Sequence, residues 1–357
     1  MMKRKDSTFL KELVEAPSPS GYEQPAAAIV REHMKATADS ISTDVLGSVH
    51  VKLDGTKKGA PSVMLAGHMD EIGMMVHYID DKGFISVKPV GGVDAAILPG
   101  MRVDIHTSTG AGSVRGVMGR KPIHLIVEEE RKTITKLDKL FIDVGMDVDE
   151  VKKKVSIGDV VTFGVGFEDF GDGLVVSRAL DDKMGVWVAM RVLEEVKKAG
   201  GAAGDLYAVA TTMEEIGARG AQTAAYALDP DIGIAIDVTH ATDYPGIDKT
   251  AHGAFELGGG PVIARGPNIN PVLFERLTAA AKAAKVDYNV QAEPRGTGTD
   301  ANKMQVAKEG KIAGLISVPV RYMHTPTEVL SLSDLEGAVK LLTRFVLDLS
   351  ADIDFTP

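Results

Sequence analysis

Three short apolar runs constrain the fold of this 357-residue chain more than any other feature. They cover residues 62–66, 206–213 and 232–236, and an ionisable side chain follows each run within two residues. Continuous apolar runs of this length are typical of strands that are buried on both faces of a sheet. Amphipathic helical patterns lie between them, at residues 184–198 and 221–227. Strands that alternate with helices predict an α/β fold with a largely parallel sheet.

The two ends of the chain extend this pattern. The first 45 residues predict surface helices, because apolar residues recur there at helical spacing. Near the other end, residues 271–284 and 333–349 predict helices around a strand at residues 312–318.

Residues 74–167 have a different pattern of apolar and polar residues. Short alternating runs are separated by Gly-containing turns such as residues 80–83, and this pattern indicates β-hairpins. We therefore expect two domains. Residues 1–73 and 168–357 form an α/β domain, and residues 74–167 form a β-rich domain inserted into it.

The composition excludes several classes of function. Lys and Arg total 40 against 50 Asp and Glu, and the net charge of −10 disfavours binding to nucleic acid or to an anionic membrane. No apolar run approaches the length of a membrane span, and charged residues interrupt the N-terminal stretch where a secretion signal would need an apolar core. We therefore expect a cytoplasmic protein. The chain has no cysteine, so any metal ion must be held by His, Asp and Glu.

Ionisable side chains gather at the expected strand ends. In open α/β sheets the ligand crevice lies outside the carboxyl ends of the strands, so these residues should meet there. Histidines and carboxylates without cysteine are suitable ligands for Zn²⁺ and similar divalent ions. A single histidine in such a place is usually structural, but the joint pattern predicts a metal site. Its members are His68, Asp70, Asp181, Asp182, Glu214, Glu215, Asp237 and His324.

Six motifs in one order carry a resemblance to a known family. They are GHMDEIG (67–73), SRALDDKMG (177–185), TMEEIGARGA (212–221), AIDVTHA (235–241), GTDA (298–301) and RYMHTPTE (321–328). Together they closely resemble the tetrahedral aminopeptidases, cytoplasmic di-metal exopeptidases that include glutamyl and deblocking aminopeptidases and some proteins described as endoglucanases. The resemblance implies a three-layer α/β/α domain of the zinc-exopeptidase type. It also implies an inserted β-barrel or PDZ-like domain that makes dimer contacts, and a hollow dodecamer built from dimers.

The resemblance also assigns the ligands of two divalent ions, Zn²⁺ or Co²⁺. It implies His68 and Asp237 for one ion, Glu215 and His324 for the other, and Asp181 as the bridge between them. In related di-metal peptidases the first Asp of such a pair is the bridge, and a cis peptide bond joins it to the second. Asp182 remains the alternative bridge, and both aspartates could instead cap the helix that begins at Lys183.

Two further carboxylates are expected to assist the reaction. Glu214 and Glu215 are adjacent, so their side chains point in different directions at a strand end. The resemblance makes Glu214 the general base that takes a proton from a metal-bridging water to give hydroxide. Asp70 is placed to accept the second ring N–H of His68 and so to fix its tautomer. Its alternative role is to cap the end of the strand.

The leading interpretation is an aminopeptidase that removes N-terminal residues from short peptides. An N-acyl amino acid deacylase or a dipeptidase with the same metal site is the alternative. A glycosidase needs two carboxylates about 5 Å or more apart across the bond and leaves the histidines unexplained, and an inactive scaffold would need a lost ligand. Three arginines are candidates for binding an acidic side chain or a terminal carboxylate, with a surface role as the alternative: Arg219, Arg265 and Arg295.

Overall fold

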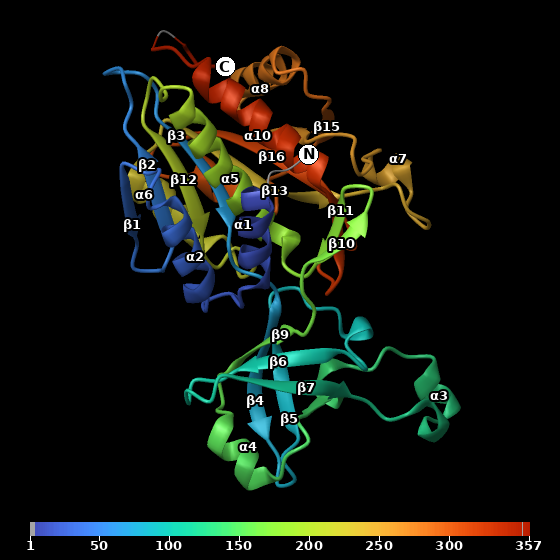
Figure 1. Ribbon diagram of the computed structural model, residues 1–357. Coiled ribbons are helices and arrows are strands. Elements are labelled where there is room, and N and C mark those ends of the chain that lie inside the picture. The colour runs from blue at the N-terminus through green and yellow to red at the C-terminus, as the bar shows by residue number, and fades with distance from the viewer. Residues whose placement is uncertain (1–3, 352) are drawn as a thin grey trace.

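The computed structural model describes residues 4–351 and 353–357. An α/β body makes up one end of the molecule and a β-barrel the other, and both chain ends lie on the α/β body (Figure 1). The α/β fold class with an added β-rich unit is confirmed. Among the described helices, none is both long and apolar enough to cross a lipid bilayer.

An 11-stranded sheet forms the centre of the body in the described residues. Its four middle strands run parallel in the order β12, β3, β13 and β16. These are β12 (Leu206–Thr211), β3 (Val63–His68), β13 (Ile232–His240) and β16 (Ile312–Arg321). They are the apolar runs of the sequence, and their almost continuous burial explains why hydrophobic residues do not alternate along them.

The outer strands are antiparallel to their inner neighbours, except that residues 289–292 run parallel to residues 262–265. The expectation of a largely parallel sheet is therefore confirmed for the middle strands and this outer pair, but not for the other outer strands. One side carries β2 (Val49–Leu53) and β1 (Ser40–Thr43). The prediction of helix for the first 45 residues is wrong over β1, because the run Ser-Ile-Ser-Thr pairs with β2 as an edge strand. The other strands are β17 (Glu328–Ser331), β11 (Leu174–Ser177), β10 (Glu168–Gly171), β14 (Val262–Arg265) and β15 (Asn289–Ala292).

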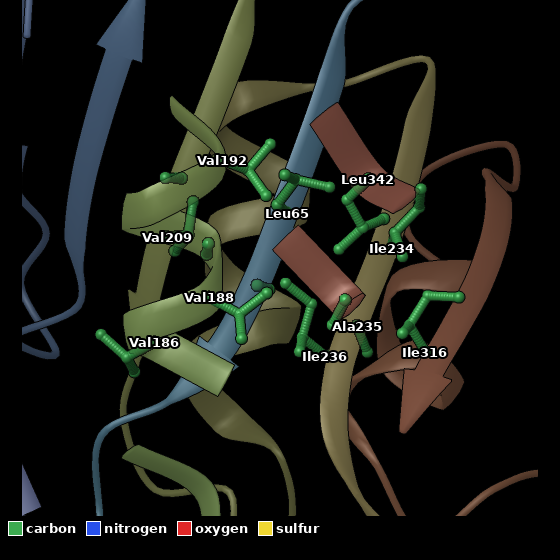
Figure 2. Close-up of a cluster of buried hydrophobic side chains, with 14 of the residues drawn as sticks. Leu65, Val186, Val188, Val192, Val209, Ile234, Ala235, Ile236, Ile316 and Leu342 are labelled. Carbon is green, nitrogen blue, oxygen red and sulfur yellow. The ribbon is translucent and has the colours of Figure 1, made fainter. Parts of the chain in front are cut away.

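Helices cover both faces of the sheet. On one face α5 (Leu180–Lys198) packs against β3, β12 and β13, and it also contacts α1 and α10. Figure 2 shows Val188 and Val192 of α5 beside Leu65 of β3, in a fully apolar contact. α6 and α9 pack against each other and against the sheet as the other layer. The remaining bounds are α1 (Arg4–Glu15), α2 (Gln24–Met34), α6 (Arg219–Leu228), α7 (Lys249–His252), α8 (Pro271–Ala283), α9 (Asp300–Gln305) and α10 (Leu332–Leu347).

The barrel is closed in the order β4-β5-β8-β7-β6-β9, with every neighbouring pair antiparallel. Side chains alternate between its interior and solvent, as in β7, where Val114 and Met118 are buried and Arg115 is exposed. Its elements are β4 (Gly73–Ile79), β5 (Ile85–Val90), β6 (Arg102–His106), β7 (Ser113–Gly119), β8 (Phe141–Asp143), β9 (Val160–Phe163), α3 (Glu128–Arg131) and α4 (Val148–Lys154).

The barrel and the body have separate hydrophobic cores. Each core is closed by its own secondary structure, which is the property that defines a domain. This separation is the reason that we propose the division into residues 1–73 with 168–357 and residues 74–167. At the boundaries, Ile72 packs in the barrel core, Gly73 begins β4, and Phe167 packs against the body core.

Candidate metal centre

The carboxyl ends of the middle strands bring the expected ligands together. His68 ends β3 and pairs in register with Thr211 of β12, so the turn with Glu214 and Glu215 begins beside it. Asp237 lies in β13, the other neighbour of β3. His324 follows β16 in a short loop, and Asp181 lies at the start of α5, where it and Asp182 have non-helical backbone angles.

Asp181 lies at the middle of this cluster. Its Oδ1 is 3.2 Å from Nε2 of His68, and its Oδ2 is 3.4 Å from Nε2 of His324. Nε2 of His324 also lies 3.4 Å from Oε1 of Glu215. The two oxygens of one carboxylate therefore face two different groups of side chains.

The side chains form two groups with the geometry of cation sites. One consists of His68, Asp181 and Asp237, and the other of Asp181, Glu215 and His324. In each group the ligand atoms lie within 4.8 Å of one another. These are the five residues expected from the sequence, and their nitrogen and oxygen donors suit Zn²⁺ or Co²⁺.

Main-chain carbonyls set the orientation of both imidazole rings. Nδ1 of His68 is 3.1 Å from the carbonyl oxygen of Asp70, and Nδ1 of His324 is 3.1 Å from that of Gly92. A carbonyl oxygen only accepts hydrogen bonds, so each Nδ1 must carry the proton. The Nε2 atoms, which face Asp181, are then the atoms free to bind a metal ion.

Electrostatics in the cluster favour a bound cation. Burial, helped by the charges of Asp237, Asp300 and Glu215, raises the pKa of Glu214 to about 9. Burial and the charge of Asp181 raise the pKa of Glu215 to about 7. Burial would also raise the pKa of Asp181, but the two histidines hold it below its usual range. Buried acids that raise one another's pKa are stabilised as anions when divalent cations lie among them.

The side chain of Asp70 holds the turn that carries both glutamates. Its Oδ1 accepts the N–H of Glu214 at 3.0 Å, and its Oδ2 accepts the N–H of Glu215 at 3.1 Å and the hydroxyl of Ser20 at 2.6 Å. Its Oδ1 is also 3.5 Å from Nδ1 of His68, but that nitrogen is closer to the Asp70 carbonyl oxygen. The expected contact with the His68 ring is therefore made mainly by the backbone of Asp70.

Asp181 and Asp182 divide the two roles that the sequence left open. The peptide bond between them is cis, as the resemblance implies. Asp181 faces the histidines, whereas Asp182 accepts the N–H of His68 at 3.0 Å and that of Gly185 at 3.2 Å. The contact with Gly185, three residues on, is that of a helix cap. This arrangement supports Asp181 as the bridging residue.

Several residues of the centre were missed by sequence reasoning. Gly92, in the loop after β5, brings the barrel against His324, and a Cβ atom there would lie 2.8 Å from Nδ1. Glu328 accepts the N–H groups of Asp181 and His324. Glu23 accepts the N–H of Met213 at 3.1 Å, next to Glu214. Glu328 belongs to the RYMHTPTE motif, which was a signal for it. All three residues, however, act through main-chain contacts, which the type of a residue does not predict.

Other candidates lie at the margin of the centre. Asp300 of the GTDA motif is buried behind β12, where its Oδ2 accepts the hydroxyl of Thr211 at 2.6 Å. His240 is exposed at the end of β13. The three arginines Arg219, Arg265 and Arg295 are exposed, and Arg265 lies over the ring of Phe274 at 5.0 Å. Their anion-binding roles stay predictions.

Comparison with known proteins gives a consistent match over the whole chain. The family model for M42 glutamyl aminopeptidase matches residues 47–341. Lysyl aminopeptidase of Pyrococcus furiosus is 36% identical over 99% of both chains. A TET aminopeptidase from Thaumarchaeota archaeon SCGC AB-539-E09 has a TM-score of 0.91 at 32% identity, covering 97% of this chain and 96% of the other. The TET1 peptidase of Pyrococcus horikoshii, which assembles into a tetrahedron or an octahedral shell, has a TM-score of 0.84 at 28% identity, covering 96% and 100%.

Proposed function

The chain belongs to the M42 glutamyl aminopeptidase family and is a metal-dependent aminopeptidase, and we propose that it removes single N-terminal residues from short peptides with two divalent ions. The ions are Zn²⁺ or Co²⁺, held by the two groups of side chains that share Asp181. A free peptide N-terminus is the proposed requirement for binding.

One observation carries this proposal. The two oxygens of Asp181 face Nε2 of His68 and Nε2 of His324 at 3.2 and 3.4 Å. A carboxylate shared in this way suits a two-ion centre, because Asp181 would supply one oxygen to each ion. When bound, such ions lower the pKa of a water molecule and polarise the carbonyl group of the scissile bond.

Glu214 is the proposed general base. Its Oε2 lies 3.9 Å from Nε2 of His68, yet its side chain belongs to neither ligand group, so it is free to exchange a proton. The side chain is 12% exposed at the edge of the cluster, and Asp70 holds its backbone. Glu214 would accept the proton of the attacking water and return it to the leaving amine. Proton transfer of this kind contributes about 10²- to 10⁴-fold in rate.

The assembly proposed for this chain follows its relatives. The P. horikoshii TET1 peptidase, 28% identical, forms a tetrahedral or octahedral shell. Another structure of a relative, PhTET1-12s, is a dodecamer and covers 98% of this chain at 27% identity. We propose that the present protein forms a homo-oligomer of this kind and that its barrel makes the dimer contact.

A peptide panel tests the activity. Each peptide is offered with a free and with an acetylated N-terminus to enzyme that has been stripped of metal and then refilled with Zn²⁺ or Co²⁺. We expect metal-dependent release of one residue at a time from the free N-termini only. Cleavage confined to the acetylated set would instead establish the N-acyl amino acid deacylase. Full activity after exhaustive chelation would contradict the metal centre.

A further inference from the structure

Glu328 lies between the His324 loop and the start of α5, the two segments that carry ligands of one proposed ion. It begins β17, four residues after His324, and it lies opposite Ser177 of β11. The chain leaves β11 at Ser177 and reaches Asp181 four residues later. The Glu328 side chain is only 2% exposed. It therefore fills the narrow space between the His324 loop and the start of α5.

Both carboxylate oxygens of Glu328 are engaged by backbone amides. Its Oε2 accepts the N–H of Asp181 at 3.0 Å, and its Oε1 accepts the N–H of His324 at 3.0 Å. The side chains of the same two residues meet at 3.4 Å on the side facing the cluster. His324 has a φ of 59°, a left-handed conformation that non-glycine residues rarely adopt. Its amide contact with Glu328 helps to hold it there.

We propose that Glu328 is a positioning residue that fixes Asp181 and His324 relative to each other and thereby sets the affinity of the Asp181–Glu215–His324 group for its divalent ion. This inference rests on the proposed two-ion function. Glu328 is not itself a ligand in this assignment, because both oxygens already accept N–H groups and the residue belongs to neither ligand group.

The third ligand of this group, Glu215, is also held through its backbone amide. Asp70 accepts the N–H of Glu215. All three ligand residues are thus anchored through their amides to buried carboxylates. Because the ligands are arranged when the chain folds, little ordering remains for the ion to impose when it binds.

The matched control for Glu328 is Asp334. It is fully buried, and its two oxygens accept the N–H groups of Gly258 and Gly260, both at 2.8 Å. Asp334, like Glu328, is a buried carboxylate whose two oxygens accept backbone N–H groups, and each has an isosteric amide replacement. The two glycines that donate to Asp334 are not metal ligands. Glu328→Gln and Asp334→Asn should therefore lose comparable thermal stability, since each places an NH₂ group against a backbone N–H.

The test is metal binding to the stripped protein, measured by competition with a chromogenic chelator for Zn²⁺ and for Co²⁺. We expect Glu328→Gln to bind one of its two ions about 10- to 100-fold more weakly than wild type, the usual effect of removing a group that orients a ligand. Asp334→Asn should bind both with wild-type affinity. Excess Co²⁺ should restore kcat of Glu328→Gln while KM for a free peptide stays unchanged.

Other outcomes overturn the proposal. Wild-type affinity for both ions in Glu328→Gln would do so, as would an equal loss in Asp334→Asn. If Glu328→Gln does not fold, Glu328→Asp keeps the charge but is one methylene too short to reach both amides, and wild-type affinity in that variant would contradict the proposal. A wild-type protein that binds no metal and cleaves no peptide would instead refute the proposed function, on which this inference depends.

Discussion

Glu214 and Glu215 show how adjacent residues of one kind acquire different tasks. Both amides are held by Asp70, which fixes the turn after β12. From that turn, Glu215 points to His324 at 3.4 Å, whereas Glu214 lies 3.9 Å from His68 and outside both ligand groups. The difference comes from the direction of successive side chains and requires no difference in chemistry.

Replacing Glu214 by Gln separates metal binding from proton transfer. The amide keeps the shape of the side chain but cannot accept the proton of a water molecule. We expect kcat on a free peptide to fall about 10²- to 10⁴-fold, while the protein still binds two ions. Glu215→Gln is the matched control and should lose metal affinity instead. Unchanged kcat in Glu214→Gln would refute the proposed base.

The sequence predicts residues of this centre by their chemistry and misses those that act through the backbone. His68, Asp237 and His324 follow apolar runs, so their meeting at one sheet edge was predictable. Glu328 and Gly92 could not be predicted in this way, because Glu328 accepts the amides of Asp181 and His324 and the Gly92 carbonyl contacts the ring of His324. The Asp70 carboxylate lies 3.5 Å from Nδ1 of His68. Its contacts with the amides of Glu214 and Glu215 were not predicted, since the direction of the turn after β12 was unknown.

At the scale of elements, long periodic segments and the hairpin strands of the insert were predictable, but four short strands of the body were not. The patterns at residues 184–198 and 271–284 correspond to α5 and α8 within a few residues. By contrast, β11, β14, β15 and β17 have four residues each and exist only through pairing with distant partners. Local sequence cannot show such pairing. Since β17 carries Glu328, part of the metal centre lay in the unpredicted elements.

The loop after β5 should tolerate no side chain at Gly92. A Cβ atom there would lie 2.8 Å from Nδ1 of His324, and it would disturb the hydrogen bond that sets the ring. We expect Gly92→Ala to weaken metal binding and to lower kcat/KM about 10- to 100-fold, measured by chelator competition and peptide cleavage. The control is Gly166→Ala, whose Cβ would meet only the end of the Glu15 side chain. Equal activity in the two variants would contradict the role of Gly92.

The stability of the contact among α1, α2 and α5 should depend on pH. His33 of α2 stacks on Phe9 of α1 at 3.6 Å, and its Nε2 lies 3.2 Å from Glu194 of α5. Burial alone would raise the pKa of Glu194, but His33 and Arg191 lower it to about 2. Because the folded pKa lies below the unfolded value, the stabilisation is present above pH 4.5 and is lost as pH falls toward 2.

Glu194→Gln tests this contact. We expect the free energy of unfolding of this variant at pH 7 to be about 2 kcal/mol lower than that of wild type, after allowance for screening by solvent. The difference from wild type should shrink as the pH falls below 4.5. Urea unfolding at a series of pH values measures it, with Glu195→Gln as a control on the more exposed neighbouring carboxylate. A difference that does not change with pH would assign the effect to packing alone.

At the scale of the whole molecule, the metal centre lies where the body meets the barrel. All five expected ligands come from the α/β body, but Gly92 of the barrel loop holds the ring of His324. The chain crosses between the two units beside Glu71, which is buried between Arg178 and Lys183. Composition and turn patterns predicted a β-rich insert, but nothing local to it predicted which edge of the sheet it approaches.

Removal of the metal ions should therefore destabilise the two units unequally. Each ion that binds only the folded body adds about 2.7 kcal/mol when present at 100 times its dissociation constant. Loss of each ion should lower the unfolding temperature of the body by roughly 5–10 °C. The barrel has its own core and supplies no expected ligand, so its transition should move less. Calorimetry with and without chelator measures both transitions, and the ligand variant His68→Ala should respond less to chelation than wild type. If both transitions shift equally, the contact at Gly92 couples the two cores more strongly than their separate packing suggests.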